Sequence, residues 1–270
     1  MKSFVCLLSE LLAVASVVSA TTIPKAHKAR AAVVEDLDAR APTPAGPYPP
    51  VITSCVNPMQ AAVTLDDGPY DYLQEISDYF TWAGGKATFF FNGNNWRCIY
   101  TQPSQDLVKY AYQNGHQIAS HTWAHLNLTQ LTYDEIHSEM RRVEQALQRI
   151  IGVTPAIMRP PFGAYNDLVR RVARERGQSV VTWDFDSGDS TGATVDQSKQ
   201  RYEDALGKHP SNLLALNHET KQPTAHQIIP WVVKLLKYRG YQLVTVAQCL
   251  NVEPYQKITA PQTPSPSWQC

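Results

Sequence analysis

The sequence predicts an α/β fold, a distorted and incompletely closed barrel of about seven parallel strands with helices around it. Short apolar segments alternate along the chain with longer amphipathic ones, which is typical of repeated strand and helix units. Glycines follow several of the amphipathic segments, as they do at helix C-termini. An open doubly wound sheet stays as the alternative, because this pattern does not reveal whether the sheet closes.

Seven apolar segments of strand length supply the predicted strands. In chain order they are 61–65, 87–91, 117–120, 156–159, 179–183, 213–217 and 241–244. The residues that follow the first strand, Asp66-Asp67-Gly68-Pro69, are acidic where a nucleotide phosphate would need bare backbone amides. The sequence therefore indicates no phosphate-binding loop at this position.

The helices between the strands are indicated by the residues at their ends. Thr132 and Glu135 have the spacing of a capping box at the start of a long helix, which Gly152 ends. Other helical segments are closed by Gly84, Gly85, Gly115, Gly177 and Gly240.

Residues 1–20 have the pattern of a secretory signal peptide. Lys2 precedes an apolar run that ends in the small residues Ser19 and Ala20. The run is shorter than the roughly 20 apolar residues of a membrane span and contains polar residues. We therefore expect a secreted, extracellular protein without a membrane anchor.

Composition divides the rest of the chain into three parts. Residues 21–50 are rich in Ala, Lys, Arg and Pro and predict a propeptide or disordered lead-in, with Arg30 or Arg40 as processing points. Residues 51–252 contain all the predicted strands and form the expected folded domain. Residues 253–270 are rich in Pro, Ser and Thr and predict a tail.

Charge and cysteine content narrow the classes of function. The 24 basic and 24 acidic side chains balance, so we expect no nucleic-acid or membrane partner, and we expect a monomer. Once Cys6 leaves with the signal peptide, an even set of cysteines remains in an oxidising compartment: Cys55, Cys98, Cys249 and Cys270. Disulfides are therefore expected, and thiol catalysis is not.

Side chains suited to chemistry follow three of the predicted strands, and working residues in such barrels lie at strand carboxyl ends. Asp66 and Asp67 follow the first strand, His121 and His125 the third, and His218 the sixth. Adjacent carboxylates after an apolar strand repel each other unless a cation or basic group compensates. Two histidines one helical turn apart, with one carboxylate, leave positions on a metal open for water and substrate. The pattern predicts a metal-dependent hydrolytic site.

Two further strand ends carry distinctive segments, residues 159–163 after the fourth strand and residues 184–189 after the fifth. The remaining histidines lack such a position. We interpret four of them as surface or packing residues: His116, His137, His209 and His226. The fifth, His27, lies in the lead-in.

Five short motifs stand at these strand ends. They are TLDDGP at 64–69, SHTWAH at 120–125, RPPFG at 159–163, DFDSGD at 184–189 and LNH at 216–218. In this order they resemble the motifs of the polysaccharide deacetylases, the nodulation-factor deacetylase homology domain of carbohydrate esterase family 4, and most of all the secreted fungal chitin deacetylases. The resemblance covers roughly residues 55–250, so it implies a distorted barrel and a catalytic domain over 51–252.

The resemblance also implies a metal and a pair of proton-transfer groups. One divalent metal would be held by Asp67, His121 and His125. Zinc is the expected metal, and cobalt and nickel are the alternatives. Asp66 would be the general base and His218 the general acid. A water activated by the metal would attack the N-acetyl carbonyl, and His218 would protonate the leaving amine.

Supporting roles follow from the same resemblance. Arg159 would pair with Asp66, and Asp189 would hold His218 in its charged form. The backbone N–H of Phe162 would stabilise the oxyanion. Leu216 would line the pocket for the acetyl methyl group, or serve only as a core residue, and Trp96 would offer an aromatic face to a sugar ring. These implied roles add Phe162, Leu216 and Trp96 to the candidate site as substrate-binding residues.

The sequence departs from the usual family pattern at two places. Asp189 is followed by Ser190 where family members often have Trp, which leaves one wall of the sugar cleft open and leaves Asp186 as an alternative partner for the catalytic histidine. Phe162 stands where Tyr is frequent, and this matters less because the implied role belongs to the backbone.

Covalent modifications are expected at two kinds of residue. The resemblance suggests that Cys55 and Cys249 pair, whereas Cys98 and Cys270 either pair with each other or stay free. Asn127, in Asn127-Leu128-Thr129, is a glycosylation acceptor close to the expected metal site.

The function expected from the resemblance is removal of N-acetyl groups from N-acetylglucosamine units of chitin or its oligomers, which leaves chitosan. An O-deacetylase of acetylated xylan is one alternative, because the same machinery cleaves an ester. A chitin-oligomer-binding protein without turnover is the other, although binding alone needs no acid, base or metal.

Overall fold

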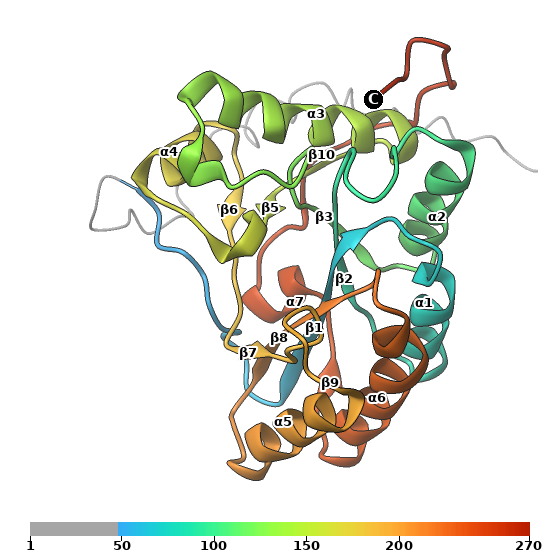
Figure 1. Cartoon of the computed structure of the whole chain (residues 1–270), viewed down its shortest axis with the longest axis vertical. Helices are drawn as coiled ribbons and strands as arrows, with labels where there is room; N and C mark the ends of the chain where they lie inside the picture. The colour runs from blue at the N-terminus through green and yellow to red at the C-terminus, as the bar shows by residue number, and fades with distance from the viewer. Residues whose placement is uncertain (1–47) are drawn as a thin grey trace, which may run out of the picture. The chain divides into compact units, whose positions relative to one another are not determined.

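The computed structural model describes residues 48–270, so the predicted signal peptide and nearly all of the lead-in lie outside the described residues. Its main sheet has eight parallel strands (Figure 1). They are β1 (Gln60–Gly68), β2 (Thr88–Phe91), β3 (Gln117–Ser120), β5 (Ile157–Met158), β6 (Ser179–Val180), β7 (Phe185–Asp186), β8 (Leu213–His218) and β9 (Gln242–Leu243).

The strand order is that of a barrel with one gap. Neighbours run β6, β5, β3, β2, β1, β8 and β7, and β9 pairs with the first residues of β1. This order follows the chain around a ring, and β6 and β7 are the two ends of the path. The prediction of an incompletely closed barrel of parallel strands is confirmed, and the doubly wound alternative is wrong.

All seven predicted strands are present, several of them shorter than expected. Three strands were not predicted. β7 has only two residues and lies in a polar segment, whereas β4 (Val153–Pro155) and β10 (Tyr255–Ile258) form a separate antiparallel pair. These three lack the apolar run by which a strand is found in a sequence.

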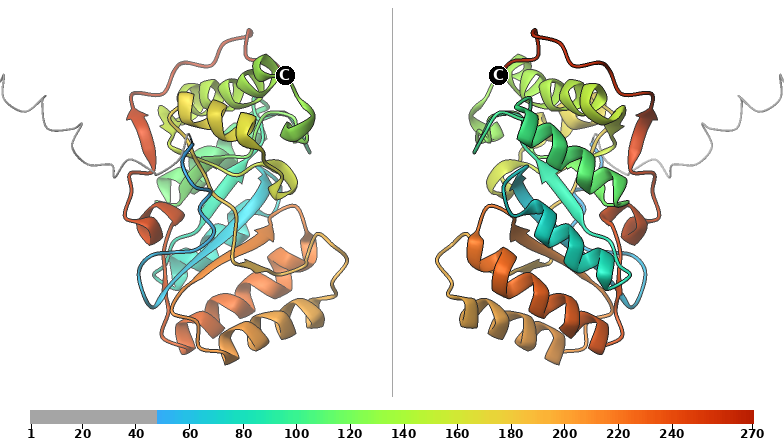
Figure 2. Two further views of the ribbon diagram at one scale, coloured as in Figure 1. Left: turned by 90° about the vertical axis from the view of Figure 1, so that its left-hand side faces the viewer. Right: turned by 90° about the vertical axis from the view of Figure 1, so that its right-hand side faces the viewer.

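Helices cover the outside of the sheet in both side views (Figure 2). They are α1 (Leu73–Trp82), α2 (Gln102–Gln113), α3 (Tyr133–Ile151), α4 (Asp167–Glu175), α5 (Val195–Gly207), α6 (Ile229–Tyr238) and α7 (Val246–Leu250), with short helical turns at Leu128–Gln130, Pro161–Gly163 and Thr224–Ile228. The predicted capping box of α3 is confirmed, because Thr132 and Glu135 exchange both hydrogen bonds. Gly152 ends α3 with a φ of 77°, a conformation that favours glycine.

The alternation of side chains along the strands separates two cores. One set points to the covering helices and belongs to the large cluster that includes Val63, Phe89, Phe91, Ala215, Phe80 and Val232. The other points into the barrel, where the apolar residues Ala62, Phe90, Ala119 and Leu214 pack with α7. On β1 the next inward positions toward the carboxyl end are Thr64 and Asp66, so the barrel interior changes there from apolar to polar.

Two disulfides tie the ends of the domain to its body. Cys55 pairs with Cys249, as the resemblance suggested, and Cys98 pairs with Cys270, which resolves the alternative left open by the sequence. The segment 253–270, expected as a tail, carries strand β10 and is bonded to the domain at its last residue.

Removing the first disulfide with Cys55→Ser and Cys249→Ser is expected to lower the free energy of unfolding by about 4 kcal/mol, because the bond closes a very long loop in the unfolded chain. The sequence separation is 194 residues. Urea unfolding of the variant and the wild type measures the difference. An unchanged midpoint with an unchanged slope would contradict a stabilising role for this bond.

Within residues 48–270, no helix has the length and apolar character required to cross a membrane.

Candidate active site

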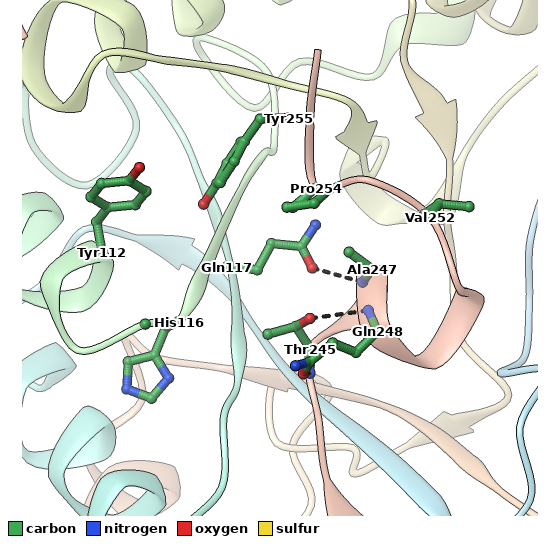
Figure 3. A pocket seen from close by; sticks show the side chains of 10 residues that line it. Tyr112, His116, Gln117, Thr245, Ala247, Gln248, Val252, Pro254 and Tyr255 are labelled. Carbon is green, nitrogen blue, oxygen red and sulfur yellow. Dashed lines mark hydrogen bonds between the residues drawn. The ribbon is translucent and has the colours of Figure 1, made fainter. Parts of the chain in front are cut away.

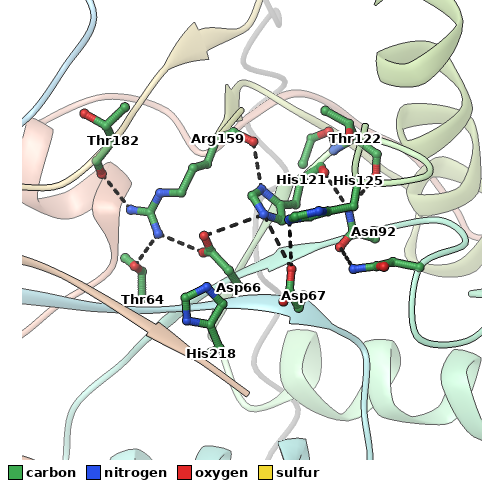
Figure 4. Close-up of polar contacts among 12 residues, drawn as sticks. Thr64, Asp66, Asp67, Asn92, His121, Thr122, His125, Arg159, Thr182 and His218 are labelled. Carbon is green, nitrogen blue, oxygen red and sulfur yellow. Dashed lines mark hydrogen bonds and ion pairs between the residues drawn. The ribbon is translucent and has the colours of Figure 1, made fainter. Parts of the chain in front are cut away.

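The structure brings the predicted site residues together at the carboxyl ends of the strands (Figure 4). Asp66 and Asp67 lie at the end of β1, and His218, the last residue of β8, is paired in register with Asp66. His121 directly follows β3, and His125 lies on the loop beyond it. These five side chains line one cavity of about 410 Å³.

Asp66 and Arg159 form a buried ion pair inside the barrel. Arg159 Nη1 donates to Asp66 Oδ1 at 2.8 Å and to Thr64 Oγ1 at 2.5 Å, and its Nη2 donates to the backbone oxygen of Thr182 at 2.7 Å. The guanidinium lies 4.2 Å from the ring centre of Phe90. Burial raises the pKa of Asp66, while Arg159 and His218 offset part of that rise. One oxygen of Asp66 is thus fixed, and the other faces the cavity.

Asp67, His121 and His125 form a set that can hold a metal ion. One ligand atom from each lies within 4.8 Å of the others. Asp67 Oδ1 is 3.3 Å from His125 Nε2 and 3.7 Å from His121 Nε2. His121 Nδ1 lies 2.8 Å from the carbonyl oxygen of Arg159, so a proton on Nδ1 leaves Nε2 unprotonated toward the carboxylate.

Two further observations fit a cation at this position. Asp67 Oδ1 is buried and has no hydrogen-bond partner among the described residues, although it faces two imidazoles. Burial lowers the pKa of His121 to about 3, so this ring is neutral at ordinary pH and offers a lone pair. A bound divalent cation would compensate the carboxylate and use all three atoms. Three protein ligands leave coordination positions open.

His218 is held by Asp189. The His218 Nδ1 to Asp189 Oδ1 distance is 2.8 Å, and the backbone N–H of His218 donates to Asp189 Oδ2 at 2.7 Å. Burial alone would lower the pKa of His218, but the hydrogen bond to Asp189 and the nearby carboxylates raise it to about 9. Asp186, the alternative from the sequence, instead accepts the backbone N–H of Gly188 at 2.8 Å. The geometry therefore places Asp189, and not Asp186, against His218.

Four non-glycine residues around the site adopt left-handed backbone conformations. Their φ angles are 76° for Asp67, 68° for Thr122, 54° for His125 and 62° for Phe162. Such conformations cost of order 1–3 kcal/mol each and persist where the surrounding structure holds them in place. Their concentration around the two aspartates and histidines is typical of a functional site.

The three residues assigned to substrate binding lie in different surroundings. Leu216 is only 4% exposed and lines the cavity, whereas Phe162 is 68% exposed at its rim, with its ring 4.8 Å from that of His125. Trp96 is 49% exposed and lies outside the cavity lining, on the loop after β2, with its ring edge-on to Tyr70. The cavity therefore has an apolar floor and the Phe162 ring at its rim, and the ring of Trp96 lies beyond that rim.

The glycosylation acceptor Asn127 is half-buried just past the metal set. Its Oδ1 accepts the N–H of Thr129 at 3.1 Å.

A second cavity, of about 480 Å³, lies at the opposite ends of the strands (Figure 3). Its lining includes Tyr112, His116, Gln117 and Tyr255. Gln117 Oε1 accepts the backbone N–H of Ala247 at 2.9 Å, so this amide joins β3 to α7. No carboxylate occurs among the described residues that line this cavity, so the acid, base and metal-ligating groups belong to the first.

Comparison with known proteins agrees with this geometry. A model of the polysaccharide deacetylase family matches residues 53–181. A chitin deacetylase of Pestalotiopsis sp is 34% identical over 210 residues, which are 76% of this chain and 68% of that protein. The chain belongs to the polysaccharide deacetylase family.

Other members of the family differ in their named substrates. A probable peptidoglycan-N-acetylglucosamine deacetylase of Arthroderma benhamiae is 36% identical over 238 residues, and this chain spans 54% of its length. The solved structure of the chitin deacetylase from the fungal pathogen Colletotrichum lindemuthianum matches with a TM-score of 0.73 at 27% identity, over 79% of this chain and 97% of that one. This polysaccharide deacetylase is therefore a hydrolase with the fold of a chitin deacetylase.

Sequence reasoning missed two residues of this deacetylase site. Trp183 lines the cavity, and a Cβ added at Gly163 would lie 2.8 Å from its ring, so the indole packs against the loop that carries Phe162. In the sequence, Trp183 directly precedes the fourth motif. This position is the one feature of the sequence that could have indicated a place in the site. Trp183 and Ser190 both line the cavity.

Glu219, the second missed residue, supports the turn after Asp67. It is fully buried, its Oε1 accepts the N–H of Tyr70 at 2.6 Å, and its Cδ lies 2.2 Å from where a Cβ on Gly68 would be. Only glycine leaves room for this carboxyl group. Burial raises the pKa of Glu219 well above its usual range.

Replacing Glu219 with Ala is expected to weaken zinc binding by about 10-fold, because loss of the hydrogen bond to the N–H of Tyr70 loosens the turn that positions Asp67. Competition with a fluorescent zinc chelator measures the affinity. Glu219→Gln keeps the acceptor for Tyr70 and is expected to stay near the wild type, as is Glu253→Ala at an exposed position. Equal affinities in all four proteins would contradict this role.

Proposed function

We propose that this protein is a secreted, metal-dependent deacetylase that removes N-acetyl groups from N-acetylglucosamine units of chitin or its oligomers. The observation that carries the proposal is the convergence, in one cavity, of a metal-ligating set, a carboxylate fixed by a buried arginine and a histidine held by a second carboxylate. Two disulfides support an oxidising, extracellular location.

A metal ion and Asp66 would together activate the attacking water. A divalent cation held by Asp67, His121 and His125, with zinc as the first expectation, would act as a Lewis acid that lowers the pKa of water and polarises the substrate carbonyl. Asp66 is the general base. Arg159 occupies its Oδ1, so Oδ2, which lies 3.7 Å from His121 Nε2, is the oxygen that takes the proton from the attacking water.

His218 completes the reaction as the general acid. Its Nδ1 is bonded to Asp189, which fixes the ring and favours the charged form, so Nε2 carries the proton that the leaving nitrogen needs. Breaking the amide bond then gives acetate and a glucosamine unit. Asp66 and His218 are paired in register on adjacent strands, so the base and the acid lie side by side in the same cavity.

The remaining residues bind and orient the substrate. The backbone N–H of Phe162 supplies a hydrogen-bond donor for the oxyanion. Leu216 on the cavity floor accommodates the acetyl methyl group. Trp96, beyond the rim, offers its half-exposed ring to a neighbouring sugar. A glycan on Asn127 would lie near the cleft and affect access to it.

Parallel acetate-release assays on N-acetylglucosamine oligomers, peptidoglycan and acetylated xylan test the substrate. The proposal predicts the highest kcat/KM on the chitin oligomers. A clear preference for xylan would favour an O-deacetylase, and one for peptidoglycan would favour the activity named for the Arthroderma relative. Binding of oligomers without acetate release from the metal-saturated protein would show that the chain is a binding protein only.

A further inference from the structure

We propose that the C-terminal segment, residues 259–270, is a strap that holds the loop carrying Trp96 in its substrate-binding position. The loop, here called the Trp96 loop, comprises residues 92–101 between β2 and α2. The inference rests on the proposed function, because it assigns the strap to the binding of the polysaccharide chain. The residues of the strap itself touch no group of the catalytic set.

The strap is anchored along its length. The backbone N–H of Thr259 donates to the carbonyl of Gly152 at 2.7 Å, and that of Gln262 donates to the carbonyl of Arg149 at 2.8 Å. Figure 1 shows the segment ending beside helix α3. The strap thus runs from β10 past the end of α3 toward the active-site side of the domain.

An aromatic contact and a covalent bond join the strap to the Trp96 loop. The ring of Trp268 lies 5.7 Å from that of Tyr100, and the guanidinium of Arg149 is within 6 Å of both ring centres, at 5.8 and 5.7 Å. Cys270, the last residue, forms the disulfide with Cys98. Cys98 is two residues from Trp96, so the bond fixes the backbone next to the proposed sugar-binding ring.

The base of the Trp96 loop is tied to the metal site. Asn92 Nδ2 donates to the carbonyls of His121 and Thr122 at 2.5 and 3.0 Å. The N–H of Gly93 donates to the carbonyl of Trp123 at 3.0 Å. Residues 92–94 are therefore held by the loop that supplies two metal ligands, and Cys270 Sγ of the strap lies 3.5 Å from the carbonyl oxygen of Gly93.

The tip of the loop, residues 95–98, has weaker support than the two ends, since Ile99 and Tyr100 are buried in the large core cluster. The Arg97 to Asp71 ion pair has its aspartate 62% exposed, and exposed pairs contribute little to stability. The ring of Trp96 makes an edge contact with Tyr70, and the ammonium of Lys221 lies 5.6 Å from its centre. The disulfide is thus the covalent constraint on the tip that carries Trp96. Its removal affects substrate binding more than the chemical step.

The test uses the full chain with Cys98→Ser and Cys270→Ser together, and the matched control is Gln269→Ala, whose side chain bonds only within the strap. We expect the KM for the N-acetylglucosamine pentamer to rise about 5-fold in the double variant, with kcat within about 2-fold, since the lost contact is one of binding. Hydrolysis of 4-nitrophenyl acetate, which is too small to reach Trp96, is expected to be unchanged. The control is expected to match the wild type in all three measurements.

Hydrogen exchange of the amides of residues 95–98 provides a readout that needs no turnover. We expect faster exchange there in the double variant and unchanged exchange at residues 120–125. Unchanged exchange together with an unchanged KM would overturn the inference. If the wild type releases no acetate from the pentamer, the proposed function fails. Calorimetry then measures the affinity of the wild type and of the double variant for the pentamer. Equal affinities would overturn the proposed role of the strap.

Discussion

Replacing Asp66 with Asn is expected to lower kcat for acetate release from chitin oligomers by about 10³-fold, because the amide cannot accept the proton of the attacking water. Zinc binding is expected to persist, since the metal-ligating atoms belong to Asp67, His121 and His125. Acetate assays and metal analysis of the purified variant measure the two effects separately. Loss of turnover with retention of metal would assign Asp66 to proton transfer.

The same substitution also disturbs the fold, and the controls must separate the two consequences. Arg159 is fully buried, so the variant leaves its charge without a carboxylate, which costs about 3–5 kcal/mol of stability. Thr64 and the carbonyl of Thr182 still accept two of its hydrogen bonds. Assays therefore belong well below the unfolding midpoint of the variant.

Asp186→Asn is the matched control, because Asp186 lines the same cavity but bonds to the backbone of Gly188. It is expected to retain activity within about 10-fold of the wild type. Full activity of Asp66→Asn would refute the assignment of the base, and an equal loss in both variants would show that any carboxylate in the cavity is required.

Replacing Asp189 with Asn is expected to move the alkaline limit of activity to lower pH. His218 must be protonated to act as an acid, so activity falls as the pH rises through its pKa. Asp189 is the main group that raises this pKa against the effect of burial. A hydrogen bond to a charged group contributes about 1.5–3 kcal/mol, which corresponds to a shift of about one to two pH units.

The measurement is kcat/KM against pH for both proteins, each saturated with the same metal. An unshifted alkaline limb in the variant would contradict the role of Asp189. Stability provides a second readout, because the folded pKa of His218, about 9, is above its usual value of 6.5. The stabilisation from this pair is complete below about pH 6.5 and is lost as the pH rises through about 9. The variant is expected to lack this dependence.

The barrel and most of the site could be predicted from the sequence for a physical reason. Parallel strands end at one edge of the sheet, so motifs that directly follow apolar strands must converge, and this rule alone groups Asp66, Asp67, His121 and His218. The strands themselves are buried and apolar, so their positions were found within a few residues.

The remaining features depend on contacts that no local pattern encodes. Asp186 and Asp189 lie in one loop, and only the folded path of that loop decides which faces His218. The pairing of Cys98 with Cys270 depends on the path of the last residues of the chain. These residues lack apolar periodicity, so their path could not be predicted from the sequence. Glutamate is usually found at the protein surface. Glu219 is buried here because Gly68, which has no side chain, leaves room for its carboxyl group.

Zinc titration of the chelated protein, with acetate release from the N-acetylglucosamine pentamer as the readout, tests whether deacetylation requires a metal bound to Asp67, His121 and His125. We expect no activity without metal and a linear rise that stops at about one equivalent, because one set of three ligands is present in the cavity. The same titration of His125→Ala is expected to show little activity at any zinc concentration used. Full acetate release by the metal-free protein would show that deacetylation needs no metal at this site.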